Sequence, residues 1–144
     1  MKKFEKNIEL RWSDIDQNNH VRHSAYYDFG AYARIQCFVE AGFGTKEMVA
    51  QSIGPILFKE ECSFIREIKP EDHIRINMLK GDIRKDGSRW VIHHELFNQN
   101  DEKVAHITVH GAWMDTELRK LKSPTAELAL AFDDLPVGNY YRRD

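Results

Sequence analysis

The stretch SAYYDFGAYARIQCFVEAGFG, residues 24–44, decides the fold of this chain. Its apolar side chains recur at helical spacing and leave only a narrow polar stripe, which predicts a helix over residues 24–41 that other elements enclose. Ser24 is expected to cap this helix with its hydroxyl, and Gly42 and Gly44 are expected to end it. A helix with so little polar surface requires a sheet that covers most of its circumference.

Alternating apolar and polar residues predict strands on both sides of this helix. One strand, residues 7–13, precedes the helix and is expected to bury Trp12. Four more follow the glycine-rich bend after the helix, at residues 56–68, 74–78, 90–96 and 104–114. The pair Asp86-Gly87 is a strong hairpin signal, and residues 124–132 are expected to form a short terminal helix. The expected fold class is α+β, with one twisted antiparallel sheet wrapped around a single long helix.

Composition excludes several function classes. The 144 residues are expected to form a single domain, with a core within residues 7–115 and a C-terminal extension over residues 116–144. The net charge of −2 argues against a nucleic-acid partner, and no apolar run is long enough to span a membrane. The N-terminus carries no apolar signal core, so we expect a cytoplasmic protein. Cys37 and Cys62 are too few for a disulfide framework and are expected to be reduced core residues.

The densest polar segment, DIDQNNHVRH at residues 14–23, lies between the first strand and the start of the buried helix. Unpaired amides at a helix start favour developing negative charge, and a carboxylate held beside them can act as a general base or a nucleophile. Asp14 and Asp16 are two residues apart and share a face on an extended backbone, and His20 can donate to a carboxylate or carry a proton. Ordinary turn and capping roles for the same residues remain the alternative.

The loop and the helix together resemble a known family. The residues that carry the resemblance are Arg11-Trp12-Ser13-Asp14-Ile15-Asp16, then Asn19-His20-Val21, then Tyr26-Tyr27 and Ala33-Arg34. They resemble the hotdog-fold thioesterases of the 4-hydroxybenzoyl-CoA thioesterase type, and a second block, FIREIKPED at residues 64–72, resembles a later part of the same family's pattern. The resemblance covers residues 7–115 and implies a five-stranded antiparallel sheet around one central helix.

The resemblance also implies roles for individual residues. Asp16 matches the family's catalytic aspartate, which acts as a general base or a nucleophile. The backbone amides near His23 and Ser24 match the group that polarises the thioester carbonyl, and His20 matches a histidine that orients the substrate or the carboxylate. Asp14 matches a first aspartate that is more often a structural cap.

The chain departs from the family's pattern at three places. Asn19 stands where the family has glycine, Ile15 where it has threonine, and Arg22-His23 where it has two asparagines. Asparagine tolerates a positive φ better than most residues, so we expect the turn at Asn19 to be kept. The changes at residues 22 and 23 border the carbonyl-binding amides and bear on substrate preference rather than on the fold.

The activity implied by the resemblance is hydrolysis of an acyl-CoA thioester to a free acid and CoA. Chemistry of this kind needs no metal, and no cofactor is expected apart from the CoA that is part of the substrate. Two alternatives stay open, namely a thioesterase that acts on acyl carrier protein and a non-catalytic module that binds an acyl group or CoA. The family's site lies between subunits, so we expect a homodimer or a dimer of dimers, with neither nucleic acid nor membrane as a partner.

The substrate needs an apolar slot for its acyl part and cations for its phosphates. Candidates for the slot are the aromatic residues Tyr26, Tyr27 and Phe58. Candidates for the CoA phosphates are Arg84, Lys85 and Arg89 around the Asp86-Gly87 hairpin, and also Lys59 and Arg66.

The seven histidines raise the question of a metal site. His106 and His110 share a face of one strand, beside His93 and His94 on its neighbour. Because no carboxylate or cysteine stands at a matching spacing, a polar face or a subunit contact is favoured over zinc.

Overall fold

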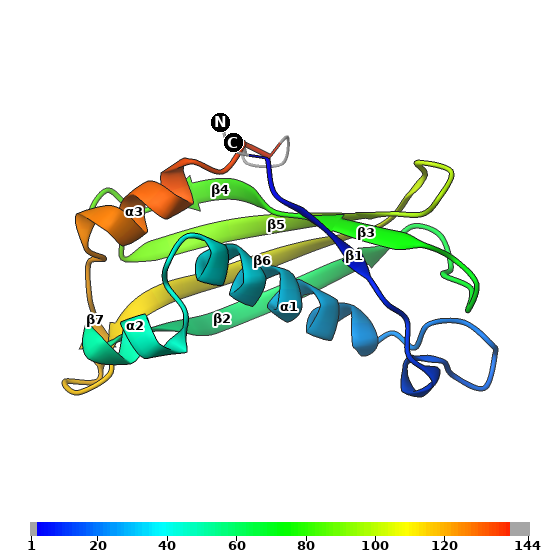
Figure 1. The fold of residues 1–144 in the computed structure, drawn as a ribbon, viewed down its shortest axis with the longest axis horizontal. Coiled ribbons are helices and arrows are strands. Elements are labelled where there is room, and N and C mark those ends of the chain that lie inside the picture. Colours follow the sequence, from blue (N-terminus) through cyan, green and yellow to red (C-terminus); the bar gives the residue numbers. More distant parts are fainter. Residues whose placement is uncertain (1–2, 139–144) are drawn as a thin grey trace.

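The computed structural model of the chain describes residues 3–138. A long helix, α1, lies across one face of a curled antiparallel sheet (Figure 1). The strands run in the order β1-β3-β5-β6-β2, while β4 pairs with β5 and β7 pairs with β6. Their bounds are β1 Glu5–Ile8, β2 Ile53–Phe64, β3 Ile74–Asn77, β4 Leu79–Ile83, β5 Arg89–Phe97, β6 Lys103–Asp115 and β7 Lys120–Leu121. This arrangement confirms the predicted α+β class, with seven strands in place of five.

The helices are α1 Ala25–Glu40, α2 Thr45–Ala50 and α3 Ala126–Asp133, and a 3-10 turn, η1, covers Trp12–Asp14. The prediction of α1 over residues 24–41 was correct to within one residue at each end. The prediction of a single long helix left out α2, which lies in the glycine-rich bend. No residue of α2 is buried, so its six residues carry no apolar periodicity that the sequence could reveal.

The core lies between α1 and the concave face of the sheet. Along β6, alternate residues Ile107 and Val109 are completely buried on this face, as the pattern of that strand predicts. From α1, Phe29 and Ala33 pack into the same cluster. Phe38 stacks edge-on against a tryptophan of β6, Trp113, with ring centroids 5.5 Å apart, and this contact closes the end of the core near α2.

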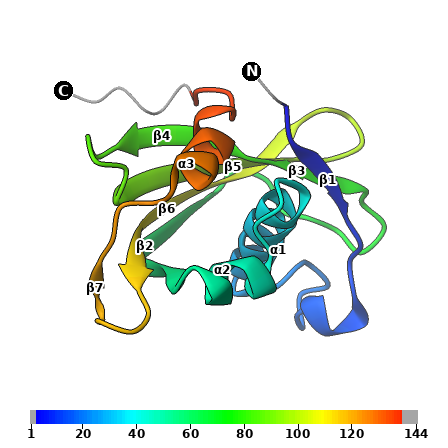
Figure 2. The same cartoon turned by 60° about the vertical axis from the view of Figure 1, so that its left-hand side comes forward.

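The predicted enclosure of α1 was only half right, because the structure covers one side of this helix. Ile35 is 60% exposed, and Tyr32 and Val39 are also exposed. Figure 2 shows no second layer over this outer side of α1. The predicted strand at residues 7–13 was also too long, because β1 ends at Ile8 and Trp12 opens η1 with its side chain 92% exposed.

The C-terminal segment joins the same core. Leu128 and Phe132 of α3 and the following Leu135 are buried, and the chain then runs beside β4, where Val137 bridges to Lys80. The predicted terminal helix is therefore present, shifted by a residue or two towards the C-terminus. Among the described residues, no helix is long and apolar enough to cross a membrane.

Candidate active site

The loop before α1 is held in place by Asp14, whose side chain is completely buried. Its carboxylate accepts hydrogen bonds from the Arg11 amide at 2.9 Å and from Arg11 Nη2 at 2.8 Å. Burial alone would raise the pKa of Asp14, but the hydrogen bonds from the side chain and backbone of Arg11 outweigh it and lower the pKa below its ordinary value. With Arg22 Nη2 3.8 Å away, Asp14 is a structural anchor, in agreement with its predicted role as a cap.

Asp16 is placed differently, on the open side of the loop. Its Oδ1 accepts from the amides of Asn18 at 2.9 Å and His20 at 3.2 Å, which fixes the orientation of the carboxylate. The backbone turns tightly here, with the Asp16 amide donating to the His20 carbonyl and Asn19 at φ 63°. Asn19 thus adopts the positive φ expected of it. The second oxygen, Oδ2, accepts no hydrogen bond from residues 3–138 and is available to water or substrate.

His20 reaches Asp16 through its backbone and not through its ring. Its imidazole Nε2 lies 3.2 Å from Glu67 Oε2, on the segment that follows β2. The two elements also meet through the backbone, because the Val21 amide donates to the Ile68 carbonyl at 2.9 Å. His20 therefore joins the loop to the end of β2 and holds the Asp16 carboxylate through an amide hydrogen bond.

Within residues 3–138, the start of α1 leaves backbone amides without an acceptor, among them those of His23 and Ser24. Ser24 occupies the N-cap position but makes no side-chain capping bond, because its hydroxyl accepts from Arg22 Nη1. The prediction that this hydroxyl caps the helix was therefore wrong. Within the described part of the chain, the amides of His23 and Ser24 donate to no acceptor. They stand at the positive end of a 16-residue helix, where partial charge favours an anion or a polarised carbonyl oxygen.

An open cavity of about 280 Å³ lies beside this loop and the start of α1. Its lining includes four residues selected from the sequence, namely Asp16, His20, His23 and Tyr26. It also includes four that were not assigned to this slot, namely Phe64, Ile65, Arg66 and Glu67. Two sequence signals concerned this second group, namely the block at residues 64–72 and the choice of Arg66 as a candidate for the CoA phosphates. Neither shows that the end of β2 meets the loop.

Tyr26 forms the apolar floor of this cavity. It is buried, and its ring meets Phe64 edge-on with centroids 4.9 Å apart. Burial raises the pKa of Tyr26 to about 12, so its hydroxyl stays protonated at neutral pH. Tyr26 can therefore contact an acyl group or donate a hydrogen bond, but it carries no charge there.

The other predicted substrate residues, Tyr27 and Phe58, do not line the Asp16 cavity. Tyr27 is half-buried, and its hydroxyl is hydrogen-bonded to the backbone of Cys62 farther along β2. Phe58 is the extra residue of a β-bulge between Leu57 and Lys59. The guanidinium carbon of Arg89 lies over the Phe58 ring, 4.7 Å from the ring centroid. The bulge turns Phe58 to the outer face of the sheet, opposite α1, so this chain alone does not bring it to the cavity.

The predicted phosphate cations also lie far from the loop. Arg84, Lys85 and Arg89 surround the turn between β4 and β5, at the opposite end of the sheet from the loop before α1 (Figure 1). Arg84 makes an ion pair with Asp86 at 3.7 Å. Of the other two candidates, Lys59 pairs with a neighbouring glutamate on β2, whereas Arg66 lines the Asp16 cavity.

The histidines do not form a metal centre. Among the described residues, no group of three or more His, Cys, Asp or Glu side chains could hold a metal ion. His93 and His106 stack on the outer face of the sheet with Nδ1 and Nε2 3.1 Å apart, while His94 points the other way into the core. Within the described residues, Cys37 and Cys62 form no disulfide, and Cys37 is buried.

Comparison with protein families identifies the class. The family model of the thioesterase-like superfamily matches residues 10–132. This chain therefore belongs to that superfamily, a class of thioester hydrolases with the hotdog fold. A search of curated proteins found no match.

Solved structures agree on the fold. A Staphylococcus aureus protein, SAV2348, determined in complex with CoA, superimposes with a TM-score of 0.84 at 14% identity, over 96% of this chain and 89% of that one. A DHNA-CoA thioesterase from Staphylococcus aureus superimposes with a TM-score of 0.81 at 17% identity, over 92% of this chain and 90% of that one. A 1,4-dihydroxy-2-naphthoyl-CoA thioesterase from Synechocystis, Slr0204, superimposes with a TM-score of 0.82 at 13% identity, over 93% of this chain and 98% of that one. At such low identity these neighbours establish the fold and leave the substrate open.

Proposed function

We propose that this protein hydrolyses an acyl-CoA thioester to a free acid and CoA at the cavity beside Asp16. The observation that carries the proposal is that Asp16, with an oriented carboxylate, and His23, with an unused amide at the start of α1, line the same cavity. The carboxylate oxygen Oδ2 has no partner within residues 3–138, and the same is true of the His23 and Ser24 amides. Thioester hydrolysis needs these two functions, an activated nucleophile and a polarised carbonyl.

In the general-base route, Asp16 takes a proton from a water molecule as the water oxygen bonds to the carbonyl carbon. The carbonyl oxygen becomes an oxyanion beside the helix-start amides, whose dipoles stabilise it. The carbon–sulfur bond then breaks, CoA leaves as the thiolate, and the proton passes from Asp16 to the sulfur. In the alternative route, Asp16 attacks the carbonyl carbon directly, the carbon–sulfur bond breaks and CoA leaves as the thiolate. Water then cleaves the resulting mixed anhydride, which releases the free acid, restores the Asp16 carboxylate and supplies the proton that the thiolate takes up. His20 positions Asp16 in both routes.

The same proposal includes a homodimer formed through β2. This strand is an edge of the sheet, and Phe58, Phe64 and the adjacent Ile65 are all more than half exposed. Unpaired strand edges with apolar side chains favour pairing with another chain. Antiparallel pairing of two β2 strands would place the bulge of one subunit near the Asp16 cavity of the other.

A substrate panel tests the proposal. The purified protein should hydrolyse at least one of a set of short, medium, long and aromatic acyl-CoAs, and Asp16→Asn should lose this activity. Asp28→Asn is the matched control, because Asp28 is an exposed carboxylate in the first turn of α1 and does not line the cavity. The same acyl groups are also offered on acyl carrier protein. Faster hydrolysis of these substrates than of the acyl-CoAs would favour a thioesterase that acts on acyl carrier protein. Binding of an acyl-CoA without any hydrolysis would favour the non-catalytic module.

The proposed dimer is tested separately by measuring the oligomeric state. Light scattering should give the mass of two or more chains at the concentrations used for the assay. A monomer with full activity would contradict the proposed contribution of a second copy.

A further inference from the structure

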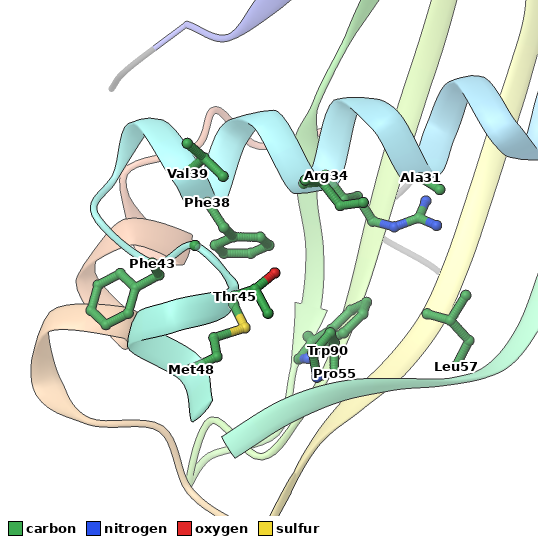
Figure 3. Close-up of a pocket in the computed structure, with 12 residues that line it drawn as sticks. Ala31, Arg34, Phe38, Val39, Phe43, Thr45, Met48, Pro55, Leu57 and Trp90 are labelled. Atoms are coloured by element: carbon green, nitrogen blue, oxygen red, sulfur yellow. The ribbon is translucent and has the colours of Figure 1, made fainter. Parts of the chain in front are cut away.

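A second cavity, of about 280 Å³, lies near the other end of α1 (Figure 3). It is bounded by α1, α2, the beginning of β2 and Trp90 of β5. Most of its wall is apolar, and its lining includes Phe38, Phe43, Met48 and Pro55. An engineered apolar cavity of about 150 Å³ binds benzene, so this one has room for an apolar group roughly twice as large. None of the residues that line the Asp16 cavity lines this one.

Arg34 gives this cavity a charged end. Its guanidinium extends towards Ala31 and Leu57, away from Phe43 and Met48 (Figure 3). The residue is only 8% exposed, and Nη1 lies 3.1 Å from the position that a Cβ on Gly30 would occupy. Any side chain at residue 30 would press against the guanidinium, so the glycine leaves the room that Arg34 fills.

The partners of Arg34 compensate its charge incompletely. Nη1 lies 3.1 Å from His94 Nε2, and Nη2 lies 3.4 Å from Glu60 Oε2, which is at the long end of the hydrogen-bond range. His94 is neutral, because burial lowers its pKa to about 3, and its Nδ1 is 2.8 Å from the Asn77 carbonyl oxygen. The Nδ1 proton is donated to that carbonyl, so Nε2 accepts from Arg34 and supplies no negative charge.

Within residues 3–138, Glu60 is the only carboxylate that contacts Arg34, and an incoming carboxylate could take its place. The Glu60 side chain is 27% exposed, so it has room to turn away from the guanidinium. The guanidinium has five N–H donors, and the two contacts above use two of them. An incoming carboxylate would find the remaining donors at one end of an apolar cavity, on a side chain that is only 10% exposed.

From this geometry we propose that the cavity between α1 and α2 binds a medium-chain monocarboxylate, with its carboxylate on Arg34 in place of Glu60 and its apolar chain against Phe38 and Met48. Decanoate is a suitable probe of this class. The site is separate from Asp16, and the proposal holds whether or not Asp16 hydrolyses a thioester.

Calorimetric titration of the full chain with decanoate, below the concentration at which it forms micelles, tests the site. The wild type should bind decanoate. Glu60→Gln should bind it roughly tenfold more tightly, because the competing charge is gone, and Arg34→Gln should lose at least that factor. Methyl decanoate, which has no charge, should respond to neither substitution. If Glu60→Gln weakens the binding of decanoate, or if Arg34→Gln leaves it unchanged, the proposal is overturned.

A pair of variants on α2 keeps the test decisive if Arg34→Gln fails to fold. Thr45 lines the cavity and is exposed, so Thr45→Trp should fill the space and abolish decanoate binding. Val49 is 71% exposed on the same helix and does not line the cavity, so Val49→Trp should bind as the wild type does. Equal binding by these two variants would place decanoate elsewhere and contradict the proposal.

Discussion

Asp14 and Asp16 are two residues apart in one loop, and the structure gives them opposite surroundings. Asp14 is buried and accepts from both the backbone and the guanidinium of Arg11. Asp16 is half-buried, has one oxygen tied to two amides, and presents the other to a cavity. The same side chain is thus a structural anchor in one place and a candidate base or nucleophile in the other. The difference comes from burial and from the hydrogen bonds that are already used.

The histidines of β5 repeat this contrast between structural and available groups. His94 is completely buried beside Arg34, and His93 is buried on the outer face next to His106. Burial is the largest cause that lowers the pKa of each, to about 3 for His94 and about 4 for His93. Both are therefore neutral structural groups at physiological pH, whereas the ring of His20 is only partly buried at the cavity.

The largest expected effect is a loss of stability in mild acid. The folded pKa values of His93 and His94 lie below the unfolded value of about 6.5, so the unfolded chain binds more protons between those values. Their stabilisation is complete above pH 6.5 and falls as the pH drops, by about 2 kcal/mol for each histidine at pH 5. Urea unfolding between pH 7.5 and pH 5 measures it, and a flat profile would contradict the neutral assignment.

Asp14→Asn should have the next largest effect and lower the free energy of unfolding by about 2 kcal/mol. The substitution removes the negative charge that accepts hydrogen bonds from the amide and the guanidinium of Arg11. The lowered pKa of Asp14 gives this variant a distinct pH dependence. The Asp14 carboxylate stabilises the wild type above the unfolded pKa of about 4, and this contribution is lost as the pH falls through the lower folded value. Wild type and variant should therefore converge in stability at low pH, and a constant difference down to pH 2 would show that charge is not involved.

The smallest effects concern the two helix caps. Ser24→Ala should change stability by less than about 0.5 kcal/mol, because the Ser24 hydroxyl caps nothing at the start of α1. Thr125→Ala should cost about 1 kcal/mol, because Thr125 Oγ1 accepts from the Leu128 amide at the start of α3. Thermal unfolding compares the two variants, and a larger loss for Ser24→Ala would restore the capping role that the sequence first indicated.

The sequence predicted the elements that have a clear period. The helix over residues 24–41 and the strand over residues 104–114 were found within two residues, because each has a long buried face. The first strand was overextended through Trp12, because apolar and polar residues continue to alternate into η1, where the backbone has already turned. Periodicity shows which residues share a face, but it does not show where extended backbone ends.

The candidate site was predicted only where it is local in sequence. Asp16, His20 and Tyr26 lie within eleven positions, and the structure places them at one cavity. Their contacts with Phe64 and Glu67 depend on how the end of β2 meets the loop, which is a long-range feature without a local pattern. The position of Phe58 could not be predicted either, because a single-residue bulge reverses the face to which the side chain points.

The contrast between Asp14 and Asp16 can be tested in one experiment. The initial rate of acyl-CoA hydrolysis per folded molecule is measured for the wild type, Asp14→Asn and Asp16→Asn, with the unfolding free energy of each. Asp16→Asn should be folded and slower by about 10²–10⁴-fold, while Asp14→Asn should be less stable but close to the wild-type rate once the folded fraction is counted. The opposite pattern, in which Asp16→Asn keeps the rate and folded Asp14→Asn loses it, would contradict the assignment of Asp16 as the group that activates the nucleophile.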